Sequence, residues 1–146
     1  ANSKYYLICN MDKYDNLSQY RLDRIDNITI LEDSRRKPFE QLKGHHNGLD
    51  LPKHMAEHVY MFTGESAQVR FEADKNKLSD IFDWFGPDIC FSNETSSSVT
   101  VSVKVNVQAM RYWALQYVNH VKVLSPPELV DLITHDLQEA AQKYSK

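Results

Sequence analysis

Apolar and polar residues alternate along two short stretches near the start of the chain. In Tyr5–Asn10 and again in Tyr20–Ile25, apolar side chains recur at about every second position, as in half-buried β-strands. The link Met11–Ser18 is rich in Asp, Asn, Lys and Ser, which favours a turn. The pattern predicts a β-hairpin, and the β-branched run Ile28–Leu31 predicts a third strand.

The pattern then changes to helical spacing. Pro38–Gly44 predicts a short helix that ends at a glycine. Asp50 is placed to cap a second helix, with Pro52 just inside its start and Gly64 as its end. The apolar stripe predicted for this helix consists of Leu51, Met55, Val59 and Phe62.

After Gly64 the periodicity alternates between the two types. Strands are predicted at 67–72, 89–91, 99–105 and 121–124, and helices at 76–85, 107–118 and from Ser125 onward. The order is strand, helix, strand, strand, helix, strand, helix. This is the split βαβ order of a ferredoxin-like domain with an added C-terminal helix, so the predicted fold class is α+β.

Composition and charge narrow the function classes. The chain has 146 residues with 42% hydrophobic and 25% charged residues, which is typical of one soluble globular domain or two small ones. The formal net charge is -3, so the whole chain is not a polycation that coats nucleic acid. Residues 1–62 hold nine Lys/Arg and nine Asp/Glu, whereas residues 63–146 hold eight and eleven. The acidic surplus therefore lies in the second half.

The two cysteines, Cys9 and Cys90, both fall in predicted strands. We interpret them as small buried hydrophobic residues in a reducing compartment. No apolar run approaches membrane-spanning length and no signal peptide is found, so the expected location is the cytoplasm.

Catalytic motifs are sparse. No nucleotide-cradling glycine loop and no nucleophile elbow occurs. His54, Glu57 and His58 spell H-x-x-E-H, the signature of one class of zinc peptidase. A third ligand on another helix has no clear supplier, so an exposed helix face is favoured and a metal-dependent hydrolase is kept as an alternative. We predict no enzyme, no metal and no cofactor.

Two arginines in the second predicted strand are a better functional candidate. Arg21 and Arg24 have tyrosines nearby in sequence, and guanidinium groups beside aromatic faces suit bases and phosphates. The alternative is that each forms a surface ion pair with Asp23 or Asp26. In a regular strand, side chains three positions apart point to opposite faces. We therefore expect Arg24 in a pocket and Arg21 tying the strand to its neighbours or to a second subunit.

The segments Tyr5-Tyr6-Leu7 and Tyr20-Arg21-Leu22-Asp23-Arg24-Ile25 resemble the WYL domain of bacterial transcriptional regulators. Four later stretches are similar to its C-terminal extension, WCX: Val69-Arg70-Phe71, Phe82–Gly86, Trp113–Tyr117 and Val121–Pro126. The resemblance implies a WYL effector-binding domain with a helical connector at residues 1–64, built as a partial Sm-like β-barrel. It implies a ferredoxin-like WCX domain at residues 65–146 that takes part in dimer contacts.

The resemblance also implies a function. We expect the effector-binding and dimerisation portion of a regulator whose operator DNA is bound by a winged helix outside these 146 residues. The expected effector is a nucleotide or a short single-stranded nucleic acid, and the expected partner is a second copy of the chain. A purely structural oligomerisation module is a further alternative. The residues expected at the effector site are Arg24, Arg21, Tyr6, Tyr20, Tyr5 and Asp23, with Arg70 and Arg111 at a second ligand contact or an interface.

Overall fold

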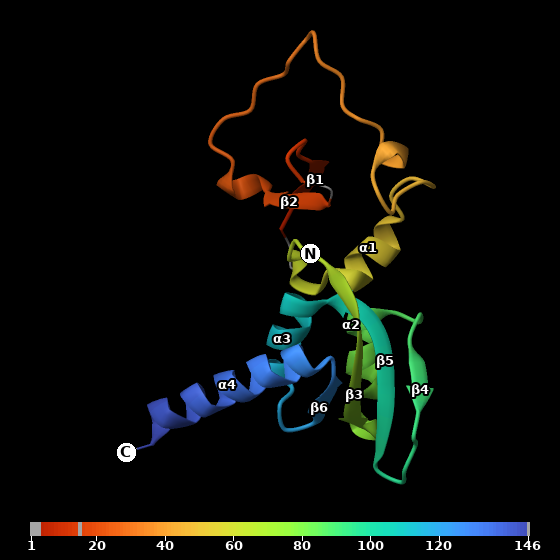
Figure 1. Cartoon of the computed structure of the whole chain (residues 1–146), viewed down its shortest axis with the longest axis vertical. Coiled ribbons are helices and arrows are strands. Elements are labelled where there is room, and N and C mark those ends of the chain that lie inside the picture. Colours follow the sequence, from red (N-terminus) through yellow and green to blue (C-terminus); the bar gives the residue numbers. More distant parts are fainter. Residues whose placement is uncertain (1–3, 15, 146) are drawn as a thin grey trace.

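The computed structural model describes residues 4–14 and 16–145 (Figure 1). Its first part is a two-stranded antiparallel hairpin followed by short helical segments. These elements are β1 (Tyr6–Asn10), β2 (Leu17–Arg21), 3-10 turns at Leu22–Arg24 and Phe39–Gln41, α1 (Leu51–Glu57) and a 3-10 turn at Val59–Met61. The predicted hairpin is confirmed, although its second strand begins and ends earlier in the sequence than the alternation indicated.

The second part is a four-stranded antiparallel sheet with helices. Its elements are β3 (Ser66–Asp74), a 3-10 turn at Lys75–Lys77, α2 (Leu78–Phe85), β4 (Cys90–Ser92), β5 (Ser98–Asn106), α3 (Val107–Gln116), β6 (Val121–Ser125) and α4 (Pro127–Tyr144). The strand order is β4-β5-β3-β6, with every neighbouring pair antiparallel. The predicted order of strands and helices is confirmed, and the topology is that of a split βαβ domain.

One face of this sheet forms the main hydrophobic core. Val69, Phe71 and Ala73 of β3 are buried, and Val99, Val101, Val103 and Val105 of β5 lie beside them. Trp113 of α3 is fully buried. The centroid of its ring lies 5.3 Å from that of Phe71 and 4.7 Å from that of Phe85. Successive side chains of a strand point to opposite faces, so the alternation of valines with polar residues in β5 gives the sheet one face that packs on the core and one that carries polar side chains.

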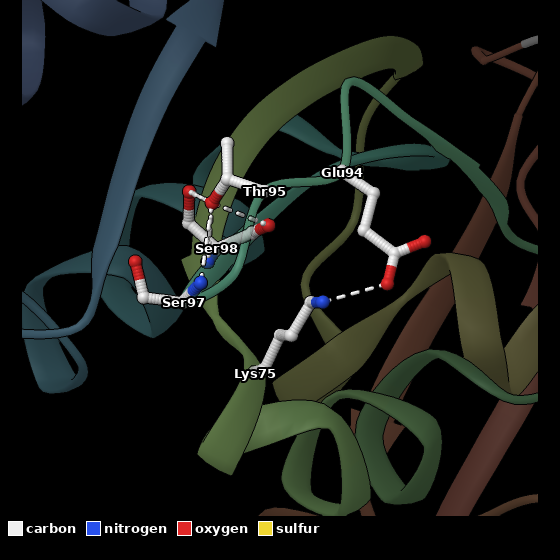
Figure 2. A network of polar contacts seen from close by, with 5 residues as sticks. All are labelled: Lys75, Glu94, Thr95, Ser97 and Ser98. Atoms are coloured by element: carbon white, nitrogen blue, oxygen red, sulfur yellow. Dashed lines mark hydrogen bonds and ion pairs between the residues drawn. The ribbon is translucent and has the colours of Figure 1, made fainter.

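The turn between β4 and β5 is held by side-chain hydrogen bonds rather than by glycine. Figure 2 shows Thr95 within the turn, where its hydroxyl accepts hydrogen bonds from the backbone N–H groups of Ser97 (3.3 Å) and Ser98 (2.9 Å). Lys75 donates to Glu94 at 2.6 Å, which ties the turn to the end of β3. The turn leads directly into β5, whose Ser98 pairs with Asp74 at the end of β3.

The predicted apolar stripe of the helix after Asp50 is confirmed at Val59 and Phe62, which lie in or against the main core, and is wrong at its other two positions. Leu51 and Met55 are 46% and 43% exposed, whereas His54 is buried. The helix is also shorter than predicted, because His58 leaves the helical backbone angles (φ -112°, ψ 54°), and Tyr60 and Met61 then adopt left-handed angles (φ 61° and 57°). This kink lets Val59 enter the core separately from the helix, which turns a different face of α1 inward. The cap is confirmed, since the Asp50 carboxylate accepts the Lys53 N–H at 3.1 Å.

Three other predictions are corrected by the structure. Ile28–Leu31 is not a strand; Ile28 and Ile30 are 73% and 86% exposed in a long loop (Figure 1). A strand needs a partner edge, and within the described residues the hairpin contains only two strands and no barrel. Cys90 is exposed rather than buried because β4 is a short edge strand, and both cysteines are free thiols.

Over the described ranges, no helix has the length and apolar character needed to cross a membrane.

Candidate functional site

The hairpin holds the predicted effector residues in a defined order. Tyr6 of β1 pairs with Arg21 of β2, and Leu7 pairs with Tyr20. Directly opposed residues point to the same side of a sheet, so Tyr6 and Arg21 share one face and Tyr20 points to the other. The N–H of Leu22 donates to the carbonyl of Tyr5 at 3.0 Å, which continues the pairing to the end of β2.

Arg24 lies outside the strand, contrary to the sequence prediction. The strand ends at Arg21, and Leu22–Arg24 forms a 3-10 turn. The rule that side chains three positions apart point to opposite faces of a strand therefore does not apply to this pair of arginines. The turn instead presents Arg24 at the surface, where it is exposed.

Arg21 forms a two-point ion pair within the hairpin. Its Nε donates to one oxygen of the Asp23 carboxylate at 2.9 Å and its Nη2 donates to the other at 2.6 Å. Lys4 approaches the same carboxylate at 3.5 Å. The hydrogen bonds from Arg21, and then the charges of Arg21 and Lys4, lower the pKa of Asp23 to about 2. The Arg21 guanidinium is thus held in place by its neighbour.

Arg24 differs from Arg21 in its contacts. Among residues 4–14 and 16–145, no hydrogen bond or ion pair involves its guanidinium. A positively charged group without a protein partner at a surface turn is free to contact an anion.

The tyrosines are arranged unequally. Tyr5 and Tyr20 are 81% and 44% exposed, whereas Tyr6 is half-buried. The Tyr20 hydroxyl donates to the Met11 sulfur at 2.9 Å, which holds the ring against the hairpin turn. The rings available for stacking are therefore those of Tyr5 and Tyr20.

Arg70 and Arg111 lie in the second part of the chain. Arg70 is exposed on β3, between the buried Val69 and Phe71, and its cross-strand neighbours are Ser102 and Ser125. Arg111 of α3 donates to Asp136 of α4, with Nε and a carboxylate oxygen 2.6 Å apart. This ion pair raises the pKa of Arg111 and lowers that of Asp136, chiefly through the hydrogen bonds between them. The two arginines thus belong to different surfaces.

The residues of the H-x-x-E-H motif have other partners. The Nδ1 atom of His58 lies 2.9 Å from the backbone carbonyl of His54. Glu57 accepts from Lys104 at 3.2 Å. In the part of the chain that the structure describes, no group of three or more His, Cys, Asp or Glu side chains is arranged to hold a metal ion.

Sequence reasoning missed the contact between the hairpin and α1. Gln19 of β2 lies 2.8 Å from His54 of α1, measured between their Nε2 atoms. A cleft of about 730 Å³ opens beside this contact. No periodicity indicated it, because a buried histidine does not register as part of an apolar stripe.

The family model described as the WCX domain matches residues 63–141, which is more than half of the chain. No match is found among curated proteins. The matched region begins just before β3 and ends within α4, and so contains the four-stranded sheet and its helices.

Proposed function

The chain belongs to the WCX domain family, and from this premise we propose that it is the effector-sensing and dimerisation portion of a bacterial transcriptional regulator. WCX domains are found in WYL-family bacterial transcriptional regulators and do not define an enzyme family. The observation that carries the proposal is the WCX match combined with a preceding hairpin that contains Tyr5-Tyr6-Leu7 and Arg21-Leu22-Asp23-Arg24.

We assign residues 1–64 as the WYL part with its connector, and residues 65–146 as the WCX domain. In this proposal the hairpin is a reduced form of the Sm-like barrel. The effector is a nucleotide or a short single-stranded nucleic acid. Arg24 contacts its phosphate, and Tyr20 and Tyr5 offer ring faces to its bases. Asp23 holds Arg21, which keeps the end of β2 in place next to Arg24.

Effector binding would act by shifting a population. A ligand changes an equilibrium only if it binds one arrangement better than the other. The hairpin meets the WCX domain through α1, whose Glu57 pairs with Lys104 of β5. A ligand that favours one placement of the hairpin would change the arrangement of a dimer, and with it the spacing of DNA-binding domains elsewhere in the regulator.

We further propose that the dimer forms through α4. Beyond Leu129, which is fully buried, this helix extends away from the sheet (Figure 1). Leu137 is 38% exposed and Tyr144 is 88% exposed, and Ala141 lies between them on the same stripe. A stripe of this kind on a projecting helix suits the same stripe of a second copy across a two-fold axis.

The sensor assignment is tested by titrating the protein with a fluorescein-labelled eight-nucleotide single strand. Anisotropy is recorded at two salt concentrations for the wild type, Arg24→Ala and Arg35→Ala. The Arg35→Ala substitution is the matched control, because it removes the same charge from an exposed loop. We expect Arg24→Ala to weaken binding about threefold to tenfold. The slope of the logarithm of the binding constant against the logarithm of salt concentration should become shallower by about 0.7, the contribution of one phosphate contact on a single strand.

Two results would contradict the sensor assignment. One is the absence of binding at low salt, which would leave a structural oligomerisation module as the better description. The other is equal loss of binding in Arg24→Ala and Arg35→Ala, which would mean that the strand is attracted by overall charge rather than held at the hairpin.

A further inference from the structure

Histidines gather in one cleft. The chain contains six histidines, and four of them, His45, His46, His54 and His58, line the cleft of about 730 Å³ between the loop before α1, the helix itself and the start of β3. We call these four the histidine cluster. The other two, His120 and His135, lie in the second part of the chain, outside the cleft.

His54 is the member that joins the hairpin to α1. Its side chain is buried, and its Nε2 accepts the amide N–H of Gln19 on β2 at 2.8 Å. Its ring stacks on that of His58 with a centroid distance of 4.2 Å. A proton added to His54 would therefore lie on a buried side chain and against a second imidazole, and the Nε2 lone pair that accepts from Gln19 would be lost.

The charged groups around His54 give little compensation for such a proton. Burial, followed by the charges of His58 and His45, lowers its pKa to about 4, and Glu57 opposes this only weakly. The Glu57 carboxylate is already paired with Lys104 at 3.2 Å, and that of Asp50 caps α1 through the Lys53 N–H. The remaining charged groups that line the cleft are His46, Lys53 and Glu65.

Among the described residues, the other attachments of the hairpin are an exposed ion pair between Lys37 and Asp12 at 3.4 Å and the buried side chains of Leu17 and Ser18. The main hydrophobic core begins at Val59 and includes no hairpin residue. Leu17 is the buried apolar side chain of the two strands, and two-stranded hairpins are marginal on their own in water. Loss of the contact between Gln19 and His54 would therefore release the hairpin without unfolding the four-stranded sheet.

We propose that the histidine cluster is a pH-sensitive junction, which holds the β1–β2 hairpin on α1 at pH 7 and releases it as the pH falls toward 5. The direction follows from linkage. The closed form favours neutral His54, so the stability of the junction is fully present above the ordinary pKa of 6.5 and is lost as the pH falls from 6.5 toward about 4. With these two values, opening at pH 5 is favoured about 20-fold more than at pH 7.

The test is hydrogen exchange by NMR on the full chain at pH 7 and pH 5, with rates corrected for the intrinsic effect of pH and with EDTA present. The amides of β2 report the hairpin and those of β5 report the sheet. His54→Gln removes the titrating ring while keeping a side chain that hydrogen-bonds. His135→Gln is the control, because that histidine lies exposed on α4.

We expect protection of the β2 amides to fall about tenfold to 20-fold at pH 5 in the wild type and in His135→Gln, with β5 unchanged. In His54→Gln the β2 protection should change less than twofold. Unchanged β2 protection in the wild type would overturn the proposal. It would mean that the side-chain amide of Gln19 rotates by 180°, so that its oxygen accepts a hydrogen bond from protonated His54. The same loss in His54→Gln would also overturn it. If His54→Gln does not fold, the wild-type comparison of β2 with β5 still decides the outcome.

Discussion

At the scale of single residues, the hairpin separates two arginines that look equivalent in sequence. Arg21 is fixed by Asp23 at 2.9 and 2.6 Å, whereas Arg24 has no such partner within the described ranges. The sequence suggested different roles through strand alternation, but the difference arises because the strand ends at Arg21 and a 3-10 turn follows. Roles that depend on a turn cannot be read from a pattern of period two.

The Arg21–Asp23 pair gives a prediction for titration. Because its pKa is lowered to about 2, the Asp23 carboxylate should stay charged as the pH falls and lose the ion pair only near pH 2. In Arg21→Ala its pKa should return toward the ordinary value of 3.8. Carboxyl ¹³C shifts followed by NMR would measure both values. An Asp23 pKa near 3.8 in the wild type would show that the pair does not persist in solution.

At the scale of elements, the sequence predicted the WCX half far better than the hairpin half. The valines of β5 alternate strictly and are all buried, and Gly86 ends α2 with φ 72°, where a side chain would be strained. The strands and helices of this half have local signals strong enough to specify them. The stripe of α1 failed at Leu51 and Met55 for a different reason, because the helix buries His54 instead, and the Nε2 of His54 accepts the amide N–H of Gln19, 35 residues away in sequence.

The exposed stripe of helix α4 should control self-association of the chain. Leu137→Asp places a charge in the middle of the exposed stripe and should weaken self-association at least tenfold, because a buried unpaired carboxylate costs more than about 1.4 kcal/mol. Gln142→Asp adds the same charge away from the stripe and should leave association unchanged. Sedimentation velocity over a concentration series measures both. A monomeric wild type at high concentration, or equal effects of the two substitutions, would contradict a dimer through α4.

At the scale of the whole molecule, the chain consists of a well-packed domain and a lightly attached hairpin. The core runs from Val59 to Leu129, and the hairpin meets the rest through α1 and the histidine cluster. This division suits a sensor, since elements that move on ligand binding are drawn from the less stable parts of a fold. The sequence predicted the order of the elements, but the attachment depends on contacts distant in sequence, which periodicity does not report.

We propose above all that an anionic effector binds the hairpin rather than the sheet of the WCX domain. The most direct measurement is a ¹H–¹⁵N NMR titration of the full chain with the eight-nucleotide single strand. We predict saturable shift changes concentrated between Tyr5 and Ile25, strongest around Arg24, with smaller changes in α1. Changes centred on Arg70 and the open face of the four-stranded sheet, or no saturable changes at all, would contradict the claim.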